Sequence, residues 1–247
     1  MEQDYELKYH RLEKVYWWFI ARRAMIFELI EQLNIKKDSK ILDIGCSGGH
    51  LIELLVANGF KNAYGIDKSM NAINLCKKKL IKNVYVMNAA KTKFNNEEFD
   101  VIIASDILEH IKNDMPALKE WNRILNPNGK LILFVPSFKF LWSKHDEMNH
   151  HYRRYSKSEL IRILKKSNFE IIRSSYWNFS LFFPIIVFNY FRSILLKNNN
   201  KNKDNLYELS PFINKTLLSL LKCENLLLKY LNFPLGISVF AVATKVQ

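Results

Sequence analysis

The chain has 247 residues, which suggests one domain with at most one elaboration and is enough to bury a sizeable hydrophobic core. Apolar residues make up 49% and charged residues 25%, the balance of an ordinary globular protein. Cys46, Cys76 and Cys223 are scattered and odd in number, which excludes a disulfide framework and favours a reducing, cytoplasmic location. The polar first residues argue against a secretory signal, and the apolar runs fall short of the roughly 18 residues of a membrane span.

The formal net charge is +13, from 37 Lys and Arg against 24 Asp and Glu. Such an excess is typical of nucleic-acid-binding proteins. Lysine far outnumbers arginine, however, and arginine is the residue that reads phosphates and guanines through paired hydrogen bonds. The abundance of Lys, Asn and Ile is instead typical of an AT-rich coding sequence. We therefore expect no nucleic-acid partner and favour contact of a basic face with an anionic membrane.

The first predicted element is an amphipathic helix over residues 15–30, in which Trp17, Trp18 and Phe19 follow one another. After it, short runs rich in β-branched residues alternate with segments of helical periodicity. This alternation, with nearly continuous apolar strands, predicts an α/β fold in which helices cover both faces of a parallel sheet. The predicted strands are 40–45, 63–67, 84–88, 99–105, 130–136, 170–177 and 237–245, and the predicted helices between them are 50–58, 69–80, 113–125 and 156–167.

Residues 178–235 separate the last two predicted strands and are far longer than an ordinary connection. The segment opens with the apolar run FSLFFPIIVFNYFRSILL, crosses a polar run at 197–205, and resumes as an amphipathic helix over 211–231. Two interpretations remain open. The segment is either a helical cap packed on the sheet, or a hydrophobic lid or membrane-facing element.

A glycine-rich turn follows the first predicted strand, in the sequence ILDIGCSGGHL of residues 41–51. Glycine permits the sharp turn and lets a ligand approach the backbone closely. The spacing is D-x-G-x-x-G-G, which differs from the G-x-G-x-x-G of dinucleotide enzymes. Asp43, two residues before Gly45, is poorly suited to a pyrophosphate and well suited to an ammonium group. The turn therefore predicts a ligand with a charged amine, such as the methionine moiety of S-adenosylmethionine (SAM).

Asp67 ends the second predicted strand, at the sheet edge where open α/β folds bind their ligands. A carboxylate in this place accepts hydrogen bonds from both hydroxyl groups of a ribose. An aspartate before a helix often serves as its N-cap instead, but Ser69 is available for that role. We therefore expect Asp67 to bind the ribose of the cofactor.

These features resemble the class I SAM-dependent methyltransferases, over roughly residues 38–177 and the last strand. The resemblance is carried by DIGCSGG, YGIDKS, FDVIIASDILEHI and LNPNGKLILFVP. It implies a Rossmann-like, doubly wound sheet of seven strands, mostly parallel with an antiparallel last strand, and SAM as the cofactor. It divides the chain into four parts. These are a helical cover (1–37), the SAM-binding core (38–177), the helical insertion (178–235) and the last strand (236–247).

The resemblance also implies a set of cofactor-binding residues. Asp43 and the turn residues Gly45, Cys46 and Gly49 would hold the methionine end of SAM, and Asp67 would bind the ribose. The remaining residues would lie near the adenine, except Ser105, which would face the cofactor from the fourth strand. Asn88 stands where the family more often has Asp, but its amide oxygen can still accept a hydrogen bond from an amine. The implied residues are Asp43, Gly45, Cys46, Gly49, Asp67, Lys68, Ser69, Asn88, Ala89 and Ser105.

Methyl transfer from a sulfonium requires orientation and, if the acceptor is a hydroxyl group, a base. Candidate bases follow the fourth and fifth strands, whose carboxyl ends face the cofactor. We predict catalytic roles for His110, His150 and His151, although His110 is equally suited to a structural role. The loop that carries the last two also holds His145, Arg153 and Arg154, which suggests recognition of an anionic or hydroxylated group.

Asp106, Glu109 and His110 have the spacing that places three side chains on one helical turn. This segment resembles the acidic-x-x-Glu-His segment of ubiquinone-biosynthesis O-methyltransferases, which is tied to a divalent metal. Many relatives with the same pattern use no metal, so we predict no metal site. Zinc binding by the three loop histidines is not supported by cysteine or by helical spacing.

The sequence therefore predicts a methyltransferase that acts on a small or lipid-like acceptor, at a hydroxyl oxygen. Alternatives are C-methylation of a quinone-like ring, methylation of a glycan, peptide or RNA, and a SAM-binding protein without transferase activity. We further expect the insertion to form a lid over the active site, with reversible contact with anionic lipid. Its apolar run contains Arg192 near its end and is followed by the cations Lys197, Lys201 and Lys203.

Overall fold

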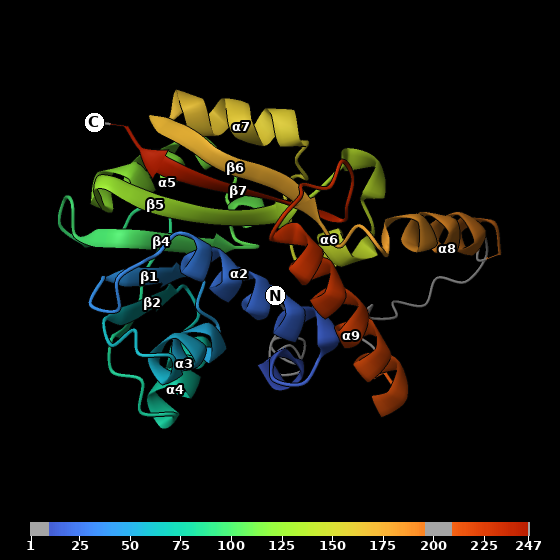
Figure 1. The fold of residues 1–247 in the computed structure, drawn as a ribbon, viewed down its shortest axis with the longest axis horizontal. Coiled ribbons are helices and arrows are strands. Elements are labelled where there is room, and N and C mark those ends of the chain that lie inside the picture. Colours follow the sequence, from blue (N-terminus) through green and yellow to red (C-terminus); the bar gives the residue numbers. More distant parts are fainter. Residues whose placement is uncertain (1–9, 196–208, 247) are drawn as a thin grey trace.

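The computed structural model describes residues 10–195 and 209–246, and from Asn189 to Leu195 its backbone alone. Within these ranges one sheet has seven strands in the order β3-β2-β1-β4-β5-β7-β6 (Figure 1). The first five are parallel, and β7 is antiparallel to both of its neighbours. The predicted α/β fold with an antiparallel last strand is confirmed. The strands are β1 (Ile41–Ile44), β2 (Ala63–Asp67), β3 (Val84–Val86), β4 (Phe99–Ser105), β5 (Leu125–Pro136), β6 (Phe169–Trp177) and β7 (Ser238–Lys245).

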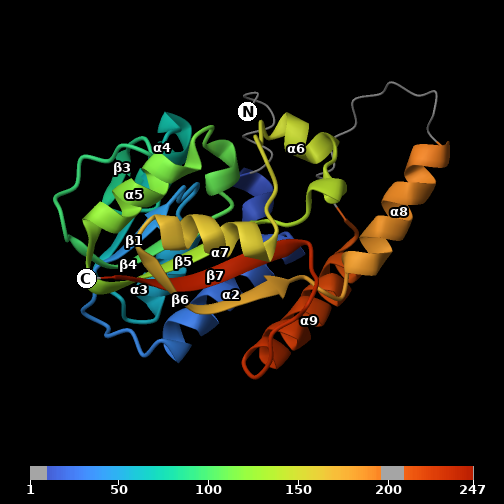
Figure 2. The ribbon, with the colours of Figure 1, turned by 90° about the horizontal axis from the view of Figure 1, so that it is seen from above.

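The sheet is buried on both faces, which explains why its strands are continuously apolar. Along β4, Val101 and Ile103 point into one cluster, whereas Ile102 and Ala104 point into the other. This alternation follows from the two-residue period of a strand. The first cluster is covered by α2 (Trp17–Gln32), α3 (His50–Ala57) and α4 (Met70–Lys78), and the second by α5 (Asp114–Ile124) and α7 (Lys157–Lys166) (Figure 2).

Helix α2 lies on the first face through Met25, Ile26, Leu29 and Ile30, each at most 1% exposed. Their i, i+1, i+4, i+5 spacing forms one stripe along the helix. A helical turn over residues 10–13 precedes α2. The N-terminal segment therefore belongs to the core, and it also brings this turn to the sheet edge described below.

The strand β5 begins earlier than predicted, at Leu125 rather than near residue 130. Leu125 pairs with Phe99, and the register between β4 and β5 then shifts before Val101 pairs with Lys130. This irregularity in the pairing lets the turn sequence NPNG lie within an extended segment. The sequence pattern predicts that this strand starts after the turn residues, because Pro and Gly ordinarily end a strand.

The insertion contributes α8 (Phe182–Leu195) and α9 (Pro211–Leu228). Helix α9 packs against α2, and its Asn225 joins three elements at once. The amide nitrogen of Asn225 donates to the carbonyl oxygen of Ala21 at 3.0 Å, and its oxygen accepts from Trp177 Nε1 at 2.8 Å. Glu224, next to it, accepts hydrogen bonds from the backbone N–H groups of Phe179 and Ser180, where the chain leaves β6.

Helix α8 extends away from the sheet in both views (Figures 1 and 2). Phe182 at its start is buried, whereas Phe183, Val187 and Phe188 are 52–63% exposed. In the part of the chain that the structure describes, no helix is both long and apolar enough to cross a membrane. The predicted lid stays a prediction. The side chain of Arg192 and the cations of 197–203 lie outside the described residues.

Candidate active site

The glycine turn joins β1 to α3 at the carboxyl edge of the sheet. Gly45 has a φ of +77°, and an added Cβ would collide with the side chain of Ile107. Gly49 has a φ of +79°, and an added Cβ would lie 2.6 Å from Ile81 Cδ1. Both positions therefore require glycine for conformation and for space. Cys46 between them is 3% exposed.

Asp67 fixes this turn from the neighbouring strand. Its Oδ2 accepts a hydrogen bond from the Ser47 N–H at 3.0 Å, and its Oδ1 accepts from the Ser69 N–H at 2.8 Å. Ser69 is the N-cap of α4, since its hydroxyl oxygen accepts from the Ala72 N–H, so the predicted cap is confirmed. Burial raises the pKa of Asp67, and the two backbone N–H groups partly offset that effect.

Asp43 lies at the end of β1 and is 5% exposed. Burial, together with the charges of Glu13 and Asp67, raises the pKa of Asp43 to about 8. Ionisation of Asp43 therefore costs free energy as long as no cation lies beside the carboxylate. This is the electrostatic condition under which an ammonium group binds well.

Two residues that the sequence analysis missed complete the turn. Glu13 Oε2 accepts hydrogen bonds from the Ser47 hydroxyl group at 2.9 Å and from the Gly48 N–H at 3.3 Å. His10 Nδ1 lies 2.9 Å from the Ser47 hydroxyl oxygen. Burial raises the pKa of Glu13, but hydrogen bonds from His10 and Ser47 and the charge of His50 outweigh it and leave that pKa lowered. The polar N-terminal segment carries no motif that would have revealed this contact.

We expect Glu13→Ala to weaken SAM binding by roughly 5- to 30-fold, because two hydrogen bonds to a charged acceptor are lost from the turn. Titration calorimetry measures this effect. Glu31→Ala is the matched control, since Glu31 is exposed and pairs with Lys37 at the surface. Equal affinity in the wild-type protein and Glu13→Ala would contradict the role given to Glu13.

The predicted adenine-binding residues lie along the ends of β2 and β3. Lys68 and Asn88 are exposed. The side-chain oxygen of Asn88 accepts from the Ala90 N–H at 2.8 Å, so it stabilises its own turn. The carbonyl oxygen of Ala89 accepts from Trp121 Nε1 at 2.8 Å, which ties this turn to α5.

The predicted acceptor side of the edge consists of η1 (Leu108–His110) and the segment after β5 that contains η2 (Lys139–Leu141) and α6 (Lys144–Met148). The ring of His110 meets the ring of His151 edge to face, with centroids 4.5 Å apart. Glu109 Oε1 lies 4.0 Å from His151 Nε2. Glu109 is fully buried, and neither of its carboxylate oxygens has a hydrogen-bond partner among the described residues.

The electrostatics of this cluster follow from its burial. Burial, with the charges of His151 and Lys68, lowers the pKa of His110 to about 3, so His110 is neutral at physiological pH. Burial and the charge of Asp106 raise the pKa of Glu109 well above its usual range. His150 is exposed with a φ of +56°, so of the two loop histidines predicted to be catalytic only His151 joins the cluster.

Comparison with known proteins decides the family. The family described as "Methyltransferase domain" matches residues 17–174, which is more than half of the chain. The chain belongs to the methyltransferase domain family. It is thus a member of the class I SAM-dependent methyltransferases, with SAM as its cofactor. Solved structures with this fold include complexes with SAM and with S-adenosylhomocysteine.

An uncharacterised protein of Methanocaldococcus jannaschii is 35% identical over 128 residues, which are 51% of this chain and 47% of that protein. The ubiquinone biosynthesis O-methyltransferase of Pelagibacter ubique is 29% identical over 164 residues, covering 59% of this chain and 67% of that enzyme. A Haloferax volcanii methyltransferase, solved in complex with the activator Trm112, has a TM-score of 0.66 and 12% identity, over 99% of this chain and 95% of that chain. The chain spans about half the length of several curated relatives.

The methyltransferase does not form the predicted turn of Asp106, Glu109 and His110. Asp106 has a φ of +57°, and the helical turn begins only at Leu108. The Asp106 carboxylate instead accepts from the Ser105 hydroxyl group at 2.8 Å and lies 3.6 Å from Arg22 Nη2. The donor atoms that lie within 4.8 Å of one another belong to Glu109, His110 and His151. These three are the described side chains best placed to hold a metal ion, and the absence of a metal site stays a prediction.

The arginines expected to recognise substrate have partners within the methyltransferase. Arg154 is buried and pairs with Asp146, and Arg153 donates to Asp114 at 3.1 Å. The guanidinium group of Arg22 lies over the rings of Trp18, Phe134 and Trp177, with its carbon 4.2–4.7 Å from their centroids. Arg22 therefore joins α2 to the sheet edge beside Asp106, close to the cluster of Glu109, His110 and His151.

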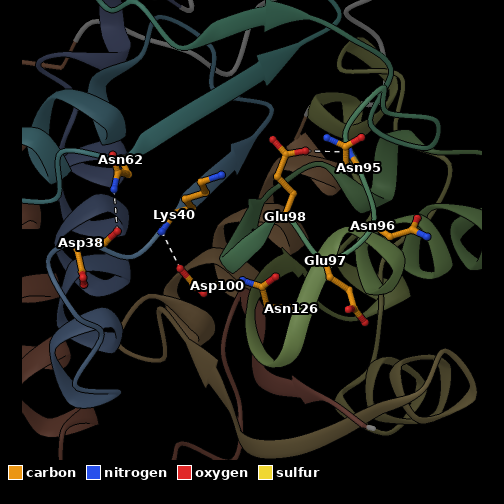
Figure 3. Close-up of a pocket in the computed structure, with 9 residues that line it drawn as sticks. All are labelled: Asp38, Lys40, Asn62, Asn95, Asn96, Glu97, Glu98, Asp100 and Asn126. Atoms are coloured by element: carbon orange, nitrogen blue, oxygen red, sulfur yellow. Dashed lines mark hydrogen bonds between the residues drawn. The ribbon is translucent and has the colours of Figure 1, made fainter.

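A separate hollow lies at the opposite edge of the sheet, where the strands begin (Figure 3). Asp38 and Asn62 meet there through a hydrogen bond, and the Asp100 carboxylate accepts from the Lys40 N–H at 2.8 Å. Ligands of open parallel sheets bind at the carboxyl ends of the strands. This hollow is therefore not the cofactor site.

Proposed function

We propose that this methyltransferase transfers the methyl group of SAM to a hydroxyl oxygen of a small or lipid-like acceptor. The observation that carries the proposal is the pairing of His110 and His151 in an enclosed cluster at the carboxyl edge of the sheet. A histidine beside the acceptor can take the hydroxyl proton as the new bond forms. The name of the Pelagibacter relative, an O-methyltransferase, supports the same chemistry.

In this scheme the acceptor oxygen attacks the methyl carbon in line with the carbon–sulfur bond. The oxygen–carbon bond forms, the carbon–sulfur bond breaks, and S-adenosylhomocysteine leaves. The hydroxyl proton passes to His151 Nε2. Asp43 and the glycine turn hold the methionine end, and Asp67 holds the ribose. We also propose a cytoplasmic location, on the basis of the cysteine usage of the chain.

The acceptor can be identified with SAM that carries a labelled methyl group. The enzyme is incubated with SAM and separate fractions of small metabolites, lipids, glycans, peptides and RNA, and the labelled product is analysed by NMR for an O-methyl group. Label in a small-molecule or lipid fraction, on oxygen, is the expected result. Label on carbon or nitrogen, or only in peptide, glycan or RNA, would overturn the proposal.

We expect His151→Ala to lower turnover by roughly 100-fold or more, because the proton acceptor is removed. Affinity for SAM should change by less than about twofold, since His151 lies on the acceptor side of the edge. His150→Ala is the matched control, because that side chain is exposed in the same loop. If turnover falls by the same factor in both variants, or stays at the wild-type value in both, His151 is not the base.

We also propose reversible contact of the insertion with anionic lipid. Phe183, Val187 and Phe188 of α8 and Phe140 of η2 are 52–66% exposed, and Phe140 lies beside Phe182 with ring centroids 6.3 Å apart. Exposed apolar side chains on a basic protein are suited to the interface of an anionic bilayer.

Flotation with vesicles of phosphatidylglycerol and phosphatidylcholine at low salt tests this contact. We expect Phe183→Ser/Phe188→Ser to reduce the bound fraction several-fold. Leu80→Ser is the control, because Leu80 is 85% exposed just after α4, outside the insertion. Absence of wild-type binding, or equal loss in the control, would end the proposal.

A further inference from the structure

The carboxylate of Asp146 lies behind His151 and meets its other ring nitrogen. Asp146 Oδ1 is 2.9 Å from His151 Nδ1, and the Asp146 side chain is completely buried. The backbone N–H of His151 also donates to the backbone carbonyl oxygen of Asp146 at 2.8 Å. The next residue, Tyr152, donates its N–H to the carbonyl oxygen of Glu109 at 2.8 Å. The ring of His151 is therefore fixed between α6 and η1.

Asp146 is itself held on its remaining sides. Arg154 donates from Nε to Oδ1 at 2.8 Å and from Nη2 to Oδ2 at 2.9 Å, the paired geometry of a guanidinium on a carboxylate. The Ser143 N–H and hydroxyl group donate to Oδ2 at 2.8 and 3.1 Å. All of these groups are donors, so Asp146 acts in this arrangement as an acceptor only.

The consequence concerns the hydrogen of the His151 ring. A carboxylate that only accepts requires the hydrogen of neutral His151 to lie on Nδ1. Nε2 then keeps its lone pair, on the side of the ring that meets Glu109 and His110. A base for a hydroxyl proton must present this lone pair.

We propose that Asp146, fixed by Arg154, is a positioning residue that holds His151 as the Nδ1–H tautomer and directs Nε2 at the methyl acceptor. This proposal rests on the proposed function, because the acceptor is the group that His151 would serve. It gives Asp146 the role of orienting His151 and Arg154 the role of fixing Asp146, and no sequence motif indicates either role.

Asp146 also has a structural role, which the test must separate from positioning. It is the third residue of α6 and forms a capping box with Ser143. A purely structural Asp146 would stabilise α6 without regard to the tautomer of His151. Imidazole nitrogen NMR of the full-length protein, labelled with ¹⁵N-histidine, distinguishes the two roles because it reports which nitrogen carries hydrogen.

The wild-type protein with SAM bound should show His151 as the Nδ1–H tautomer. Asp146→Asn should shift the ring towards the Nε2–H tautomer, because the amide can turn its NH₂ group to Nδ1. Ser143→Ala removes one hydrogen bond from the same carboxylate but leaves His151 untouched, so its tautomer should not change. A wild-type Nε2–H tautomer, an unchanged tautomer in Asp146→Asn, or a metal ion bound at Nε2 in the purified protein would overturn the proposal.

Turnover with the acceptor found by methyl labelling gives the second readout. Asp146→Asn should lower turnover by roughly 100-fold or more with SAM affinity nearly unchanged, as expected when a base carries its proton on the wrong nitrogen. Full turnover in Asp146→Asn would overturn the proposal. Failure to find any hydroxyl acceptor would instead count against the proposed function. The NMR measurement would still show whether Asp146 sets the tautomer of His151, because it requires no acceptor.

Discussion

Replacement of Asp67 by alanine is expected to weaken SAM binding by roughly 10- to 150-fold, which corresponds to about 1.5–3 kcal/mol. Two effects contribute. The variant loses the carboxylate expected to accept from the ribose hydroxyl groups, and it also loses the acceptor for the Ser47 and Ser69 N–H groups. The turn that surrounds the cofactor would then be less well ordered before binding.

Titration calorimetry with SAM measures this loss, and thermal unfolding shows whether the variant keeps its fold. Asp38→Ala is the matched control, because it removes the same charge at the opposite edge of the sheet (Figure 3). We expect wild-type affinity in the control. Affinity in Asp67→Ala within about twofold of the wild-type value would contradict the placement of the ribose at Asp67.

Asp43→Asn is expected to have opposite effects on stability and on binding. The pKa of Asp43 is about 8 in the folded protein and close to 4 in the unfolded chain. Between these values the folded state binds more protons than the unfolded state, so the stability of the ligand-free wild-type protein falls as pH rises. Asparagine does not titrate, so the variant avoids this loss. At pH 8 we expect it to be more stable than the wild-type protein by up to about 5 kcal/mol.

SAM binding should respond in the other direction. The ammonium group of SAM favours ionised Asp43, so binding near pH 7 should release a proton, and wild-type affinity should rise from pH 6 to pH 8. Asp43→Asn should bind roughly 10- to 100-fold more weakly and without this pH dependence. Calorimetry in two buffers of different ionisation enthalpy counts the released proton. No proton release, or equal affinity in the variant, would contradict the role of Asp43.

The fold could be predicted because its signals are local. Alternating short apolar runs and helical segments indicate a parallel sheet that is covered on both faces. Strand β4 shows why its strands are continuously apolar, because Val101 and Ile103 are buried on one face and Ile102 and Ala104 on the other. The glycine turn could also be predicted from the sequence, since a positive φ at Gly45 and Gly49 leaves few other residues possible. The cofactor follows from these residues because consecutive strands present their carboxyl ends at one edge.

The acceptor side could not be predicted in the same way. The spacing of Asp106, Glu109 and His110 suggested one helical turn, but the backbone at Asp106 turns away and the 3₁₀ helix starts later. His150 and His151 are indistinguishable in sequence, and only the contacts of His151 with Asp146, Glu109 and His110 distinguish it. The contact of Glu13 with Ser47 joins residues 34 positions apart and leaves no periodic signal.

The sequence by itself therefore determined the sheet, the glycine turn and the carboxylates at its strand ends. Each of these depends on backbone conformation or on the period of a single element. The tertiary structure alone decided which histidine faces Glu109, which carboxylate holds it, and where α9 packs on α2. Those outcomes depend on contacts between distant segments, whose free energy comes from burial and hydrogen bonding that no local pattern records.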